Sequence, residues 1–308
     1  MKRLFCIFLA VLLLSGCAPI QKAQSRLTFT DDLGYPVELA GWDRVVSLYG
    51  SFAETWLLAG GTLVGTTRDA ITERNLPLGE EVSLVGTVKE PNLEEIIATE
   101  PDFVILSADT ANQVKLHDAL TQAGIDHAYY RVDTFADYLD MLAQFTTMTG
   151  REDLYDTYGV RIAEHIHATL RATSGLPVCR VLLLRAYSTG VKAKGADNLT
   201  GFMLQDLGAE NIADREQSLL ENLSLEAILA EDPDHIFITT MGDEEAALAW
   251  LRENWESNPA WAGLTAVKNG HVTVLPKELF HYKPNEKWGE SYAYLAKILY
   301  PQAAGTDE

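Results

Sequence analysis

Cysteine is scarce in this sequence of 308 residues. Only three cysteines occur, and two of them, Cys6 and Cys17, lie within the first 17 residues. Cys179 alone cannot supply a disulfide framework, so the fold must be stabilised by hydrophobic cores that are large enough by themselves. Cys179 begins the apolar run CRVLLL, which favours a buried structural thiol over a reactive one.

Basic residues are also few. The chain has 24 Lys and Arg against 44 Asp and Glu, which gives a formal net charge of −20 at pH 7. A surface this acidic argues against direct binding of nucleic acid or anionic lipid. The simpler interpretation is that the acidic surface keeps the protein soluble. The more specific interpretation is that some of the carboxylates contact a basic protein partner.

Motifs of several enzyme classes are missing. The sequence has no Gly-x-Ser-x-Gly elbow, no His-Glu-x-x-His zinc helix, no P-loop and no Gly-x-Gly-x-x-Gly after a strand. Their absence does not exclude catalysis by itself, but a chain without them that is also lipid-tethered and two-lobed, as the patterns below indicate, fits capture of a ligand better; a cell-surface enzyme is kept as the weaker alternative.

The first 17 residues, MKRLFCIFLAVLLLSGC, have the layout of a secretory signal, with an apolar run too short for a good membrane span. The ending LSGC resembles a bacterial lipoprotein processing site, where cleavage precedes the cysteine and the cysteine carries the lipid. We expect a signal peptide over 1–16, a lipidated Cys17 with a linker over 17–26, and an extracytoplasmic protein anchored to the bacterial cytoplasmic membrane only through that lipid. The alternative is an ordinary signal peptide, with Cys17 incidental.

Two stretches of the sequence repeat one pattern. NLEEIIATEPDFVIL at 92–106 returns as SLEAILAEDPDHIFI at 224–238, 132 positions later. In each, an N-cap residue precedes a short helix, and a proline ends that helix before an apolar strand. Asn92 and Glu95 also have the spacing of a capping box. Each half of the chain is therefore expected to contain one such αβ unit.

Strand-like runs alternate with helical patterns along most of the chain, which indicates an α/β fold with mostly parallel sheets. Between the two repeated stretches, residues 152–172 carry an apolar stripe at helical spacing, made of Leu154, Tyr158, Ile162, Ile166 and Leu170. We expect one long helix here, joining two lobes.

Five stretches, taken together in this order, resemble lipoprotein solute-binding proteins (class III) that serve ABC importers of iron-siderophore, haem and cobalamin complexes. They are RVVSLYGSFAETWLLAGGTLVGTT, PNLEEIIATEPDFVIL, GFMLQDLGAENIAD, LSLEAILAEDPDHIFIT and GHVTVLP. The resemblance implies two Rossmann-like lobes joined by one long helix. The N-terminal lobe would span 27–150, the connecting helix 151–173 and the C-terminal lobe 174–308.

The resemblance also implies a function. A metal chelate, in the first place a ferric siderophore or haem, would bind in the cleft between the lobes and be delivered to an ABC importer permease and its ATPase. A monomer without a resident cofactor is expected. Cobalamin or a bare metal ion is the alternative ligand.

In the resembling family, an exposed glutamate at the start of a helix in each lobe meets arginines of the permease. By motif position these glutamates would be Glu54, in SFAETW, and Glu226, in LSLEAI. A local role is the alternative, because Ser51 and Glu54 have capping-box spacing and Glu226 stands in a first helical turn.

Ligands of open α/β sheets bind beyond the carboxyl ends of the strands, which nominates the loops that follow them. Basic and aromatic residues at these loops suggest an anionic ligand, with Arg185 and Tyr187 placed first. His281 or Tyr282 could ligate iron directly, although an ordinary His-Tyr loop pair is the more common case. The candidate ligand-binding residues are Tyr49, Arg68, Lys89, Arg185, Tyr187, Lys192, His281 and Tyr282.

The lipid anchor is directly testable. Cys17→Ser removes the thiol that would carry the lipid, so the variant is expected to move from the membrane fraction to the soluble fraction. Fractionation and labelling with a fatty acid measure this. A variant that stays with the membranes, together with a wild type that takes up no label, would contradict the lipoprotein interpretation.

Overall fold

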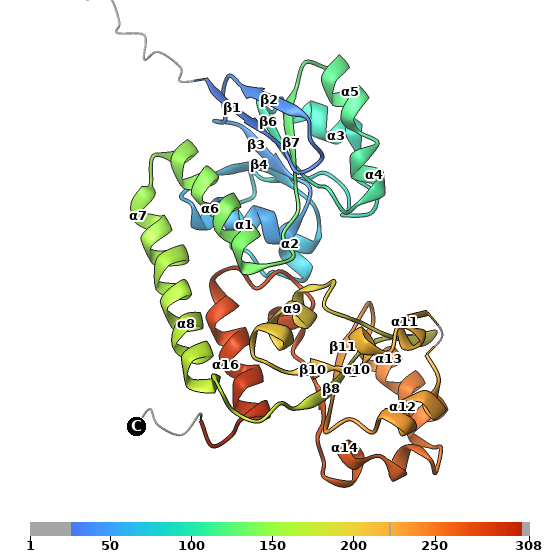
Figure 1. The fold of residues 1–308 in the computed structure, drawn as a ribbon. Helices are drawn as coiled ribbons and strands as arrows, with labels where there is room; N and C mark the ends of the chain where they lie inside the picture. The colour runs from blue at the N-terminus through green and yellow to red at the C-terminus, as the bar shows by residue number, and fades with distance from the viewer. Residues whose placement is uncertain (1–25, 222, 304–308) are drawn as a thin grey trace, which may run out of the picture.

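In the computed structural model, which describes residues 26–221 and 223–303, the chain forms two α/β lobes one above the other (Figure 1). The expected signal peptide and Cys17 lie outside the described residues. Within the described part, no helix is both long enough and apolar enough to cross a membrane.

The N-terminal lobe is built on a sheet of five parallel strands in the order β5-β4-β3-β6-β7. All five residues of β6 are buried, which is typical of a parallel strand covered on both faces. Helices α1 (Gly50–Leu58) and α6 (Phe135–Thr149) pack on one face, and α3 (Leu93–Ala98) and α5 (His117–Gln122) on the other. The strands are β3 (Val45–Ser47), β4 (Leu63–Thr66), β5 (Ser83–Leu84), β6 (Phe103–Ser107) and β7 (Asp126–Tyr130).

An antiparallel hairpin of β1 (Leu27–Thr30) and β2 (Pro36–Leu39) precedes this sheet. The carboxylate of Asp31 fixes the hairpin turn, because it accepts hydrogen bonds from the N–H groups of Leu33 and Tyr35. It also accepts from the N–H of Tyr129, which attaches the hairpin to the edge strand β7.

The C-terminal lobe has strand order β10-β8-β11-β12, all parallel, with β9 added antiparallel to β8. Its strands are β8 (Arg180–Tyr187), β9 (Gly190–Ala193), β10 (Glu210–Asn211), β11 (His235–Thr240) and β12 (Val272–Val274). Helices α9 (Leu199–Asp206) and α16 (Trp288–Leu299) cover one face, and α12 (Leu225–Glu231), α13 (Glu244–Leu251) and α14 (Thr265–Lys268) the other. The predicted class, α/β with mostly parallel sheets in two lobes, is confirmed.

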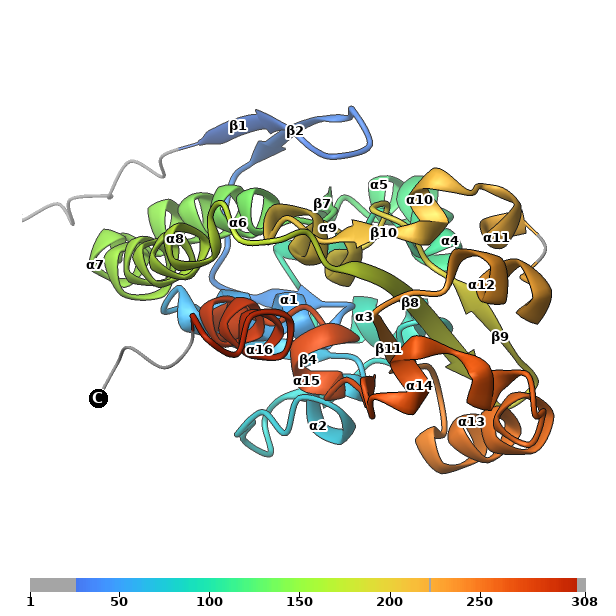
Figure 2. The same cartoon turned by 60° about the horizontal axis from the view of Figure 1, so that its bottom comes forward.

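A long helical segment connects the lobes. It runs through α7 (Glu152–Tyr155), a π-helical turn (Asp156–Val160) and α8 (Arg161–Thr173), and α8 lies alongside α16 (Figures 1 and 2). The π turn was not foreseen from the apolar stripe. Its Tyr158 carbonyl accepts a hydrogen bond of 3.0 Å from the Tyr138 hydroxyl of α6.

The repeated stretches adopt the same local structure. Helices α3 and α12 follow the N-cap residues Asn92 and Ser224, whose side chains accept hydrogen bonds from first-turn N–H groups. Both helices are followed by a residue with positive φ directly before the proline, Glu100 at +48° and Asp232 at +41°. The capping box expected at Asn92 is wrong, because the Asn92 N–H donates to the carbonyl of Val85.

Candidate functional site

The cleft between the lobes has a volume of about 680 Å³ and is lined by residues of both lobes. It lies where the sheet rule places a ligand, since Tyr49 follows β3, Ser107 ends β6 and Met241 follows β11. The basic and aromatic residues in the lining are Tyr49, Lys89, Arg185, Phe280, His281, Tyr282 and Lys283.

Two nitrogen atoms in the cleft lining are buried without a hydrogen-bond partner among residues 26–221 and 223–303: Nε of Arg185 and Nδ1 of His281. Such groups are rare in folded proteins, because a buried polar atom that has lost its water costs free energy unless another partner replaces it. Arg185 comes from strand β8 and His281 from the loop after α15 (Lys277–Phe280). The two side chains therefore bring unused polar atoms to one place.

The imidazole of His281 is neutral at physiological pH. Burial is the main cause that lowers its pKa, the positive charges of Arg185, Lys277 and Lys283 act in the same direction, and together they bring the pKa to about 4. A neutral ring has a nitrogen lone pair, so His281 can accept a hydrogen bond or bind a metal ion.

The two cleft tyrosines are hydrogen-bond donors. Burial raises the pKa of Tyr49, and the nearby carboxylates of Asp69 and Glu73 raise it further. Burial is also the main cause of the raised pKa of Tyr282. Both phenols therefore keep their protons and can donate a hydrogen bond.

Several charges in the cleft region are already paired. Lys283 of the C-terminal lobe bonds Asp133 of the N-terminal lobe at 3.3 Å, and Arg131 bonds Asp109 at 2.7 Å. In the described part of the chain, the lining residues Lys89, Arg185 and Glu73 form no ion pair. The unpaired charge of the lining is therefore weakly positive, although the chain as a whole is strongly acidic.

The structure brings together five of the eight candidate ligand-binding residues: Tyr49, Lys89, Arg185, His281 and Tyr282. Arg68, Tyr187 and Lys192 are not among the residues that line this cleft. Arg68 directly precedes helix α2 (Asp69–Thr72) and is exposed. Tyr187 and Lys192 stand on the β8–β9 hairpin, which continues the strand beyond Arg185.

Other lining residues were missed by sequence reasoning. They are Glu73, Asp109, Asn112, Asp133, Asn198 and Lys283. Lys283 could have been found from its neighbour, because it directly follows the candidate Tyr282. Asp133 carries no such signal, since its place depends on contact with the other lobe.

Glu54 is not the exposed carboxylate that was expected. Helix α1 has Tyr49 as its N-cap and Ser51 lies buried inside the helix, so the predicted Ser51–Glu54 capping box is wrong. The Glu54 carboxylate forms an ion pair with Arg74 and accepts a hydrogen bond from Asn285 Nδ2. Only 17% of the Glu54 side chain and 6% of the Arg74 side chain are exposed.

Glu226 is exposed in the first turn of α12. Its counterpart in the repeated stretch is Glu94, which is exposed at the equivalent position of α3. The matched carboxylates of the two lobes are therefore Glu94 and Glu226.

Comparison with known proteins agrees with this two-lobed architecture and its central cleft. The sequence profile of the family described as "Periplasmic binding protein" matches residues 45–279, and the chain belongs to this family.

Two curated relatives come from Bacillus subtilis. The Fe(3+)-citrate-binding protein YfmC is 27% identical over 86% of this chain and 86% of its own length. The putative ABC transporter substrate-binding lipoprotein YhfQ is 28% identical over 86% of this chain and 88% of its own length. Among solved structures, the petrobactin-binding protein YclQ of Bacillus subtilis has a TM-score of 0.71 at 19% identity, covering 92% of this chain and 99% of that one.

The buried ion pair predicts a measurable stability effect. Arg74→Ala leaves the Glu54 carboxylate largely buried with Asn285 as its remaining partner, so the free energy of unfolding is expected to fall by about 3 kcal/mol. Chemical denaturation measures this. Arg131→Ala, which removes a half-exposed ion pair with Asp109, is the matched control and should cost much less. Equal losses in the two variants would contradict the structural role of the Glu54–Arg74 pair.

Proposed function

We propose that this protein is the solute-binding component of an ABC importer and that it captures a ferric chelate in the cleft between its lobes. Membership of the periplasmic binding protein family supports binding and delivery rather than catalysis. The likeness to an iron(III) citrate-binding protein supports the choice of an iron complex. The cleft volume of about 680 Å³ suits a chelate that brings its own ligands better than a bare metal ion.

The observation that carries the proposal is the pair of buried, unpartnered nitrogen atoms on Arg185 and His281. A chelate of iron(III) with carboxylate or catecholate groups presents oxygen atoms to its surroundings, and a guanidinium donates to such oxygens in charge-assisted hydrogen bonds. Tyr49 and Tyr282 add flat apolar contact with O–H donors at their tips. Lys89 adds a second positive charge from the opposite lobe.

Haem is the second candidate ligand. The neutral imidazole of His281 and the adjacent Tyr282 are side chains that ligate iron in haem proteins. The absorption spectrum of the protein as purified separates the two cargoes, because haem gives a Soret band and a ferric chelate a broad visible band. Cobalamin, named by the sequence resemblance, is a further alternative that the same spectrum tests.

Removal of the Arg185 guanidinium tests the proposed cleft site. Arg185→Ala should weaken binding of iron(III) citrate by about 1–3 kcal/mol, the range for a lost charge-assisted hydrogen bond. Titration followed by tryptophan fluorescence gives the affinity. Lys192→Ala is the matched control, because Lys192 stands opposite Arg185 in the β8–β9 ladder but does not line the cleft. Unchanged affinity of Arg185→Ala for iron(III) citrate, or an equal loss of affinity in Lys192→Ala, would contradict the proposed binding site.

We further propose that Glu94 and Glu226 contact the membrane permease and that Cys17 tethers the protein beside it. Exposure of both carboxylates at equivalent positions of the two repeated units supports the first part. The naming of YhfQ as a lipoprotein and the LSGC ending of the signal support the second. Matched rim charges on two lobes suit a partner with two basic patches.

The double variant Glu94→Ala, Glu226→Ala is expected to keep its affinity for iron(III) citrate and to lose iron uptake by cells that carry the importer. Each first-turn charge contributes about 0.3–1 kcal/mol to its helix, so the variant should stay folded. Glu152→Ala, Glu253→Ala, which removes two exposed glutamates elsewhere, is the control. Full uptake by the folded Glu94/Glu226 double variant would defeat the docking proposal.

A further inference from the structure

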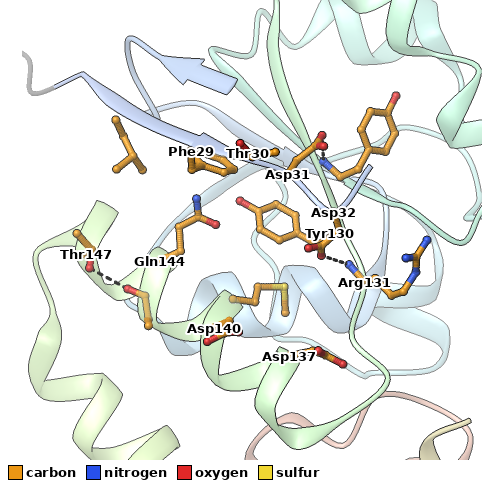
Figure 3. A pocket seen from close by; sticks show the side chains of 14 residues that line it. Phe29, Thr30, Asp31, Asp32, Tyr130, Arg131, Asp137, Asp140, Gln144 and Thr147 are labelled. Atoms are coloured by element: carbon orange, nitrogen blue, oxygen red, sulfur yellow. Dashed lines mark hydrogen bonds between the residues drawn. The ribbon is translucent and has the colours of Figure 1, made fainter. Parts of the chain in front are cut away.

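A second cavity lies on the N-terminal lobe, between the β1–β2 hairpin and helix α6. Its volume is about 530 Å³, which is within the range of small-molecule sites. It shares no lining residue with the inter-lobe cleft. Figure 3 shows β1 above the cavity, α6 below it, and Tyr130 from the end of β7 between them.

The hydroxyl of Tyr130 is the unexplained group in this cavity. Tyr130 is only 5% exposed, and its hydroxyl oxygen is buried with no hydrogen-bond partner in the described ranges. The hydroxyl points toward the space between Phe29 and Gln144 (Figure 3). Burial keeps the pKa of this phenol well above its usual value, so the group stays neutral and can both donate and accept. A buried hydroxyl without a partner is costly, and a bound ligand would remove that cost.

Negative charge dominates the cavity. The carboxylates of Asp32, Asp137 and Asp140 belong to the lining. Asp137 accepts from the N–H groups of Asp133 and Thr134, and Asp32 accepts from the N–H of Arg131. Within residues 26–221 and 223–303, the exposed side chain of Asp140 forms neither a hydrogen bond nor an ion pair with another residue.

The one cationic side chain among the lining residues does not neutralise these carboxylates. The guanidinium of Arg131 is paired with Asp109 and points away from the cavity in Figure 3. Leu27, Phe29 and Met141 make another part of the lining apolar. The cavity thus combines an apolar surface, an acidic rim and one buried hydroxyl.

We propose that this cavity is a second ligand site and that it binds a small organic cation with an apolar body. The ammonium group would lie beside the Tyr130 hydroxyl, and the exposed carboxylates of Asp32 and Asp140 at the cavity rim would offer charge-assisted hydrogen bonds. The apolar body would pack on Phe29 and Met141. A ligand of this kind has the opposite charge to the anionic chelate of the inter-lobe cleft, so the two sites do not compete for one compound.

Phenethylammonium is a suitable probe because it joins one ammonium group to one small aromatic body. In 1H–15N spectra of the protein it is expected to shift, in a saturable way, the amide signals of residues around the cavity, such as Thr30 and Gln144. 2-Phenylethanol, which has the same body without the charge, should bind at least about fivefold more weakly, because the charge-assisted hydrogen bonds are lost.

Two variants test the assigned contacts. Asp140→Asn and Tyr130→Phe should each raise the Kd of phenethylammonium by about three- to tenfold. Asp118→Asn is the matched control, since Asp118 is an exposed carboxylate of α5 outside the cavity, and its Kd should equal that of the wild type. Binding of the alcohol as tightly as the amine, unchanged Kd in Asp140→Asn, or no saturable shift at all would overturn the proposal. Iron(III) citrate titrated into the same variants should bind as to the wild type, which separates this site from the cleft.

Discussion

The carboxylate of Glu54 holds the two lobes in register. It accepts from Arg74 within the N-terminal lobe and from Asn285 of the C-terminal lobe, and Asn285 also donates to the carbonyl of Ser51 at 2.8 Å. Asn285 has a left-handed backbone with φ of +53°, which this double contact holds in place. Tyr282 and His281 lie three and four residues earlier in the same loop, so the contacts of Asn285 with Glu54 and Ser51 help to fix the position of these cleft side chains.

Much of the fold could be predicted from the sequence because its signals are local. The repeated stretches contain their own N-cap, their own apolar strand and a proline between them, and both fold as expected. The start of α1 could not be predicted in the same way. The N–H of Gly50 donates to the carboxylate of Asp69, which lies 19 positions away, so the helix is capped from outside itself and begins before Ser51. The local Ser51–Glu54 pattern was therefore misleading.

In the candidate site, too, features set by local sequence could be predicted and features set by long-range contacts could not. The rule that ligands bind at the carboxyl ends of parallel strands needs only the strands, and it found Tyr49 and Arg185. Tyr187, which the rule also nominated, stands where β8 turns back into β9 and is not among the residues that line the cleft. The pairing of charges could not be predicted from the sequence. Lys283 and Asp133 are 150 positions apart, and only the folded lobes show that they neutralise each other.

The π turn at Asp156–Val160 fixes the direction in which the two ends of the connecting helix face. A π turn accommodates one residue more than an α-helical turn, and each residue of an α-helix advances the face by about 100°. The turn therefore sets the angle between the face of α7, near the N-terminal lobe, and the face of α8 that packs on α16. The number of residues in this segment is therefore constrained. Loss of a single residue would rotate the buried Ile166 away from its contacts and turn one lobe relative to the other.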